Sequence, residues 1–117
     1  MTNQDRRRTR YLRDPLPIRL GGLAASLARI ASSARHETGA TAVTTMIEEC
    51  RWFIEWTAVE AEPEIASELV DIQRMLTLWR SAWPEAQHQL KQRILLSVQA
   101  KKWADQVLDY SGLLETA

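Results

Sequence analysis

The stretch VTTMIEECRWFIEWTAVEA, residues 43–61, decides the fold because it carries two apolar faces on one helix. At about 100° per residue, one set of side chains falls within roughly 40° of a single line and forms a complete core seam. The seam consists of Val43, Ile47, Cys50, Ile54, Thr57 and Ala61. Trp52, Trp56 and Val59 lie about 160° to 220° from that line, on the back of the helix. A helix with two apolar faces needs two partners to pack against.

The flanking segments repeat the same seam spacing. Apolar side chains recur at intervals of 4, 3, 4, 3 and 4 before and after this helix, which is typical of helices packed at a shallow angle. The first set is Leu16, Leu20, Leu23, Leu27, Ile30 and Ala34, and the second is Ile65, Leu69, Ile72, Leu76, Trp79 and Trp83. No segment has the alternating pattern of a strand. The chain is therefore predicted to be all-α.

The last predicted helix is the longest, and its apolar positions form two stripes. One stripe is Leu90, Ile94 and Leu108, and the other is Leu96, Ala100, Trp103, Val107, Tyr110 and Leu114. An apolar face this wide usually contacts two neighbouring helices. Four helices, at about 15–37, 42–61, 64–82 and 84–110, predict an antiparallel up-down four-helix bundle. It forms a single domain over 14–117, and residues 1–13 form a flexible, arginine-rich arm.

Capping residues set these boundaries. Asp14 is expected to cap the first helix, with Pro15 at its first position. Gly39 is expected to end that helix, and Thr41 to cap the next. Pro63 is expected to stop the helix over 42–61. Pro84 is expected to end the third helix and to begin the fourth.

Composition excludes several classes of protein. The chain has 15 basic and 15 acidic side chains, but they are segregated along the sequence, with a basic start, an acidic stretch over 48–73 and a basic stretch over 74–102. Surfaces of opposite sign favour self-association or pairing within the chain over non-specific nucleic-acid binding. No apolar run approaches the ~20 residues of a membrane span, so a cytoplasmic protein without membrane contact is predicted. Cys50 is the only cysteine. It is interpreted as a buried, inert thiol that supports neither a disulfide nor a multi-cysteine zinc site.

The back of the helix over 42–61 is the candidate partner-binding face. Its aromatic centre and charged rim match the anatomy of a protein interface, in which tryptophan often supplies the anchoring energy. This face consists of Trp52, Trp56, Val59, Glu48, Glu49 and Glu55. Trp56 has an alternative route into the core past Phe53. The candidate receptor is a ladder of small residues on the first helix, Gly21, Ala25, Ala28 and Ser32.

These features predict a non-catalytic protein that acts through protein–protein association, first with itself as a homodimer and otherwise with another protein. An alternative is a nucleic-acid-binding or accessory regulatory protein that uses an arm for nucleic acid or an acidic partner, and this arm carries Arg6, Arg7, Arg8, Arg10 and Arg13. A remote alternative is a small helical ribonuclease-like domain, based on the spacing of Arg29 and His36. We expect no catalytic residue, metal, cofactor or small-molecule substrate. The one Glu-x-x-His spacing, Glu85 to His88, lacks the second motif that a di-iron site needs.

Overall fold

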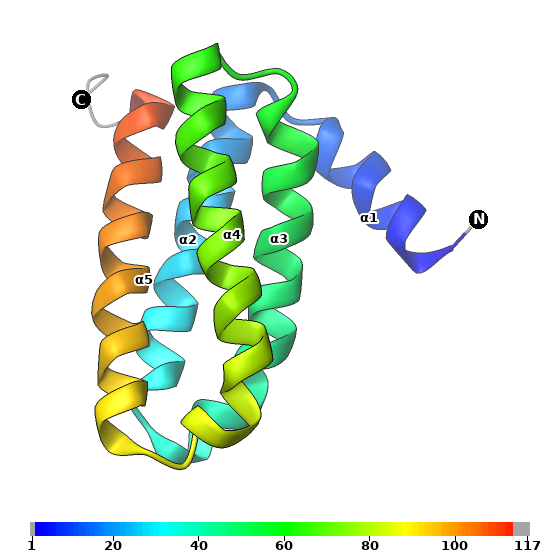
Figure 1. Cartoon of the computed structure of the whole chain (residues 1–117). Helices are drawn as coiled ribbons and strands as arrows, with labels where there is room; N and C mark the ends of the chain where they lie inside the picture. The colour runs from blue at the N-terminus through cyan, green and yellow to red at the C-terminus, as the bar shows by residue number, and fades with distance from the viewer. Residues whose placement is uncertain (1, 114–117) are drawn as a thin grey trace.

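The computed structural model describes residues 2–113 and contains no strand within them. The prediction of an all-α fold is confirmed, and the described range contains five α-helices and a 3-10 helix, η1. In chain order they are α1 (Asn3–Leu12), α2 (Leu16–Ala34), η1 (Glu37–Ala42), α3 (Val43–Ala58), α4 (Pro63–Ala86) and α5 (Leu90–Ser111). The helices α2 to α5 lie side by side, and α1 projects from their flank (Figure 1). Leu114, predicted on an apolar stripe, lies outside the described residues.

The first helix, α1, was not predicted from the sequence, and neither was η1. Its N-terminus is a capping box: the Asp5 amide donates to Thr2 Oγ1 at 3.1 Å, and the Thr2 amide donates to the Asp5 carboxylate at 3.2 Å. Each side chain satisfies an amide that the helix leaves without a partner. The segment expected to be an arm without helical structure is therefore a helix over residues 3–12. Flexibility of this segment stays a prediction.

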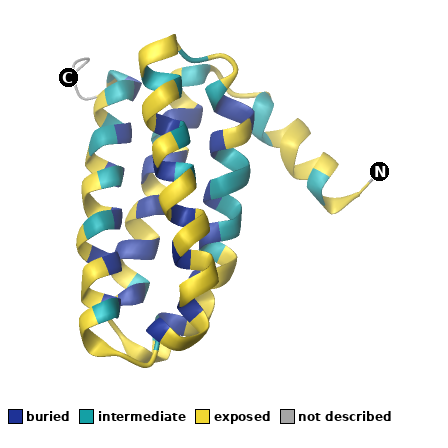
Figure 2. Cartoon of the chain, in the orientation of Figure 1, coloured by how far each residue is buried: buried dark blue, intermediate teal, exposed yellow. Residues whose placement is uncertain are grey.

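The core lies between α2, α3, α4 and α5, where the predicted seams meet (Figure 2). The seam of α3 is fully buried from Val43 to Thr57, and only Ala61, past the helix end, is half-buried. The most extensive contact joins α2 to α5. Small buried residues let these two helices approach closely, among them Ala24, Ala31, Ala100 and Ala104.

The end of α4 differs from its prediction, because the helix continues through Pro84 to Ala86. Trp83 is fully buried, and its indole Nε1 donates to the Ala40 carbonyl at 2.7 Å. Proline removes one helical hydrogen bond. The burial of Trp83 and Ala86 on either side of Pro84 offsets that loss, and α5 begins only at Leu90.

Three predicted caps are also wrong. The N-cap of α2 is Pro15 rather than Asp14, because the Pro15 carbonyl accepts the first helical amides. Gly39 does not end α2 but lies within η1, where an added Cβ would come within 2.8 Å of the Ser33 carbonyl oxygen. The N-cap of α3 is Ala42, without a side-chain bond, rather than Thr41. A 3-10 turn packed against the end of α2 thus replaces the expected glycine cap and threonine cap.

Candidate functional site

The back of α3 packs in part against α1 of the same chain. The Tyr11 ring lies parallel to Phe53, with centroids 4.4 Å apart and an interplanar angle of 4°, and 5.8 Å from Trp56. Trp56 is only 7% exposed. One of the two tryptophans predicted at an interface is therefore buried inside the monomer, beside Phe53 as the alternative interpretation expected. The aromatic residue supplied by α1 was not predicted.

A polar junction holds α1, α2 and α3 together next to these rings. The Tyr11 hydroxyl donates to the Arg19 carbonyl and lies 2.6 Å from Thr57 Oγ1, on a residue with no exposure. The buried Arg19 guanidinium donates to the Asp14 carbonyl and to the Glu60 carboxylate. Burial raises the pKa of Tyr11 to about 12, and the hydrogen bond from Arg19 lowers the pKa of Glu60. These contacts place the end of α1 in one position on α2 and α3.

Trp52 remains half-buried on α3 and stacks on Trp56, with ring centroids 5.8 Å apart. Val59 and Glu55 near it are exposed, and Val59 is 83% exposed. The face predicted around Trp52 is therefore only partly open. Its role in partner binding stays a prediction.

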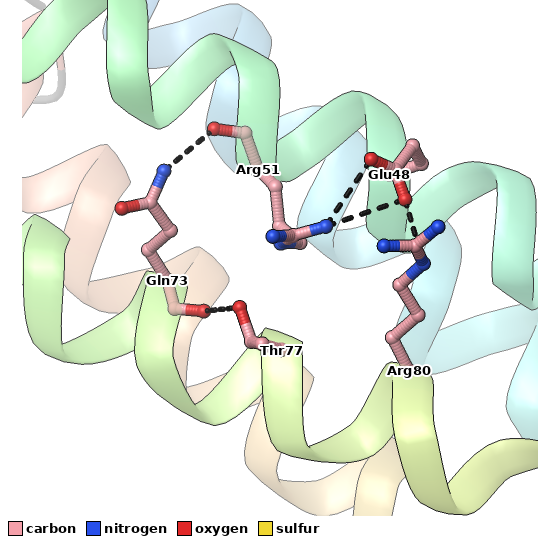
Figure 3. Close-up of polar contacts among 5 residues, drawn as sticks. All are labelled: Glu48, Arg51, Gln73, Thr77 and Arg80. Atoms are coloured by element: carbon pink, nitrogen blue, oxygen red, sulfur yellow. Dashed lines mark hydrogen bonds and ion pairs between the residues drawn. The ribbon is translucent and has the colours of Figure 1, made fainter.

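Two of the three acids expected to surround Trp52 are held in contacts within the chain. Arg51 and Arg80 both reach the Glu48 carboxylate, which links α3 to α4 (Figure 3). Gln73 of α4 donates to the Arg51 carbonyl at 3.0 Å in the same group. Glu49 faces α2 instead, where Arg29 lies 3.5 Å away and Ser26 donates to it. Partly exposed ion pairs of this kind contribute about 0–1 kcal/mol each, so they orient the helices more than they stabilise them.

The predicted ladder of small residues faces α5 more than α3. A Cβ at Gly21 would lie 2.9 Å from Leu113 Cδ1, and Ala28 and Ser32 line a cleft shared with α5. Ala25 is exposed. The α2 side chains that reach α3 near Trp52 are Ser26 and Arg29, which both contact Glu49, so the structure places the ladder on another side of α2 from the one that meets α3 there.

The five arginines of the predicted arm are all exposed on or beside α1. Within residues 2–113 none of them takes part in an ion pair. Arg7 and Arg10 line a cleft of about 350 Å³ together with Tyr11, Glu49 and Phe53. A projecting helix with free guanidinium groups presents positive charge to any anionic partner.

The residues weighed for catalysis lie in different surroundings. Arg29 contacts Ser26 and Glu49 toward α3, whereas His36 lines the cleft between α2 and α5. Cys50 has no exposure, and burial raises the pKa of its thiol to about 12, which keeps it protonated and unreactive. His88 is exposed between α4 and α5. Nowhere in residues 2–113 do three or more His, Cys, Asp or Glu side chains group as metal ligands would.

An apolar surface over α4 and α5 was missed by the sequence analysis. We define the α4–α5 surface as Met75, Leu78, Leu95 and Val98, which are 37%, 63%, 45% and 50% exposed. The first three line a groove of about 270 Å³ together with Trp79, Ala82, Gln92 and Gln99. Val98 lies one turn after Leu95. The apolar spacing beside the predicted seams could have indicated this surface.

Two residues of a predicted α5 stripe are also exposed, Leu90 at 61% and Ile94 at 39%. The second neighbouring helix expected along this stripe does not cover them. Among the described helices, none combines the length and the apolar character needed to cross a bilayer.

Comparison with known proteins provides no relative. No protein-family model matches the sequence, and no curated protein or solved structure is detectably similar to it. Function must therefore be inferred from the surfaces themselves.

Proposed function

We propose that this protein acts by binding protein, first a second copy of itself, and that it catalyses no reaction. In this proposal α2 to α5 are an antiparallel up-down four-helix bundle that presents a fixed surface in the cytoplasm. The observation that carries the proposal is the exposed α4–α5 surface. Trp52 remains a second, smaller candidate contact.

The energetic argument rests on the exposed side chains. Fully burying one Leu, Val or Met side chain contributes about 1.5–3 kcal/mol. Contiguous exposed apolar side chains on adjacent helices are a recognised mark of an interaction site. A two-fold dimer would bury the same patch on both copies. Association would then cover four apolar side chains from each subunit.

Charge on the two helices supports a second copy as the occupant. Both helices carry exposed charges of both signs, but at helical spacing exposed Asp71 and Glu85 share the face of α4 that carries Met75 and Leu78. Exposed Lys91 and Lys102 share the face of α5 that carries Leu95 and Val98. If α4 of one copy contacts α5 of the other, acidic side chains meet basic ones twice. Asp71 already pairs with Arg74 at 3.5 Å, but both are exposed, so exchanging that contact costs little.

The test is solution mass by light scattering across a dilution series. The parent chain is expected to be a dimer at high concentration, and L78E with V98E is expected to be a monomer with an unchanged helical spectrum. T77E, at an exposed position on α4 that lies about 100° or more round the helix from Met75 and Leu78, is the matched control and should remain dimeric. A parent that is monomeric at every concentration, or a double variant that keeps the parent's mass, would exclude the proposal.

A second candidate function is binding of nucleic-acid phosphates by α1, supported by its exposed arginines. Substitution tests it better than truncation, because removing α1 would also uncover Phe53 and Trp56. Changing Arg6, Arg7 and Arg8 to Gln should weaken a salt-dependent shift of RNA or DNA and lower the salt slope by about 0.9 per lost phosphate contact. No shift by the parent chain at low salt would end this candidate.

A further inference from the structure

A second concave site lies between the C-terminal half of α2 and the middle of α5. Its volume is about 540 Å³, within the range of small-molecule sites. Its lining consists of Ala28, Ala31, Ser32, Arg35, His36, Ser97 and Lys101. No acidic side chain among the described residues lines this cleft. The short side chains of the two alanines leave space in the cleft, and the other lining residues carry polar or cationic groups.

Several donors in this cleft have no partner. Within residues 2–113 the Ser32 hydroxyl, the Arg35 guanidinium and the His36 imidazole make no hydrogen bond or ion pair. Lys101 pairs with Asp105 at 2.7 Å, but both are more than 60% exposed, so this contact holds the ammonium only weakly. Four donor groups can therefore turn toward one ligand.

Hydrogen bonds engage part of the backbone at the end of α2, which would otherwise oppose an anion more strongly. A helix C-terminus is partly negative because its last carbonyls lack partners. Here the Ala31 carbonyl accepts the Ser97 hydroxyl at 2.7 Å, and the Ser33 carbonyl accepts the amides of Arg35 and His36. Two of the last four carbonyls of α2 are engaged in this way, and the side chains of Arg35 and Lys101 place full positive charges in the lining of the cleft.

We propose that this cleft binds the phosphate group of a small ligand. A guanidinium, an ammonium, an imidazole and a hydroxyl give an oxyanion donors from several directions, and the guanidinium fork matches its geometry. The space over Ala28 and Ala31 accommodates an organic body attached to the phosphate. The site is separate from the α4–α5 surface and does not depend on self-association.

The probes are inorganic phosphate and phenyl phosphate, titrated at low ionic strength and constant pH into the full chain. Binding is followed by NMR of the imidazole protons. The chain has two histidines, so His88, exposed between α4 and α5, reports non-specific effects in the same sample. The His36 signals should shift in a saturable way while those of His88 stay fixed.

Variants locate the site. R35Q and K101Q should each weaken binding about tenfold, as expected for loss of one charged hydrogen bond worth about 1.4 kcal/mol. R74Q, an exposed cation on α4, is the matched control and should bind like the parent. Tighter binding of phenyl phosphate than of inorganic phosphate would assign the site to an organic phosphate, and equal binding would assign it to the phosphate group alone. Unsaturable shifts, equal shifts at both histidines, or equal weakening by all three variants would overturn the proposal.

Discussion

Replacing Tyr11 by phenylalanine removes one hydroxyl from the junction of three helices and leaves the aromatic stack on Phe53 in place. That hydroxyl lies 2.6 Å from Thr57 Oγ1 and donates to the Arg19 carbonyl. The substitution therefore separates the hydrogen bonds of α1 from its apolar contact. It tests whether α1 is docked on α3 as the structure shows.

The expected loss follows from the burial of Thr57, which has no exposure. When the Tyr11 hydroxyl is removed, the Thr57 hydroxyl loses its partner on α1. An unsatisfied buried polar group costs about 1–3 kcal/mol. Y11F should therefore lower the free energy of unfolding by about 1.5 kcal/mol. T57V should cost about 1 kcal/mol, since it removes the same bond but leaves Tyr11 with the Arg19 carbonyl. The double variant should resemble Y11F, with a coupling of about 1 kcal/mol.

The assay is urea unfolding followed by tryptophan fluorescence and circular dichroism. For an m-value of about 1–3 kcal/mol/M, the Y11F midpoint should fall by roughly 0.5–1.5 M. Y110F is the matched control, because its hydroxyl accepts a hydrogen bond from Gln106 within the same helix. Its loss should cost less than about 0.5 kcal/mol. Equal costs for Y11F and Y110F, or additive effects of Y11F and T57V, would refute docking of α1 through Tyr11.

The pKa of Tyr11 adds a pH dependence with a defined sign. Burial raises this pKa to about 12 in the folded chain, above the usual value near 10, so folding favours the neutral phenol. Its contribution to stability is complete below pH 10 and is lost as the pH rises from about 10 through 12. Y11F should therefore lose less stability than the parent over this range. Identical alkaline curves would contradict the assignment.

Three further predictions concern glycines, the thiol and one carboxylate. Gly22→Ala should stabilise the chain by about 0.5–1 kcal/mol, since a Cβ there meets open space within α2. Gly39→Ala should destabilise it, because its Cβ would meet a backbone oxygen at 2.8 Å. At pH 8, Cys50 should react with a thiol reagent at least ~100-fold more slowly in the folded chain than in urea. The pKa of Glu60 is lowered by Arg19, so this pair should stabilise above about pH 4.5 and lose its effect below it, and E60Q should remove that dependence.

Each of these three predictions would be contradicted by a specific result. Equal unfolding midpoints for the two glycine variants would mean that Gly39 of η1 does not pack closely against Ser33 of α2. Rapid labelling of the native thiol would place Cys50 outside the core. Parallel acid curves for E60Q and the parent would show that the Arg19 contact is absent in solution.

The core could be predicted because it depends on local periodicity. Leu23, Leu27 and Ile47 recur at helical spacing, and each is fully buried. The Trp52 face was predicted for the same reason, as a stripe on one helix. What covers such a stripe depends on distant residues. Tyr11 reaches Thr57 across 46 positions, and no local pattern encodes that contact.

The remaining differences have the same cause. The rule that proline ends a helix is local, and at Pro84 it was overridden by the Trp83 contact to Ala40, 43 positions away. The exposed α4–α5 surface depends on which sides of α4 and α5 face each other. The cationic cleft beside His36 depends in the same way on how α2 and α5 pack. Helical spacing identifies the apolar faces but not which of them remain uncovered.

The sequence by itself determined the all-α class, the core seams of α2, α3 and α4, one of the two apolar stripes of α5 and the burial of Cys50, because these follow from side-chain periodicity within each helix. Only the tertiary structure decided that α1 covers Trp56, that α4 continues past Pro84 and that α4 and α5 leave an apolar surface exposed. These outcomes depend on contacts between residues far apart in the chain, whose energies exceed the local preferences of any one segment.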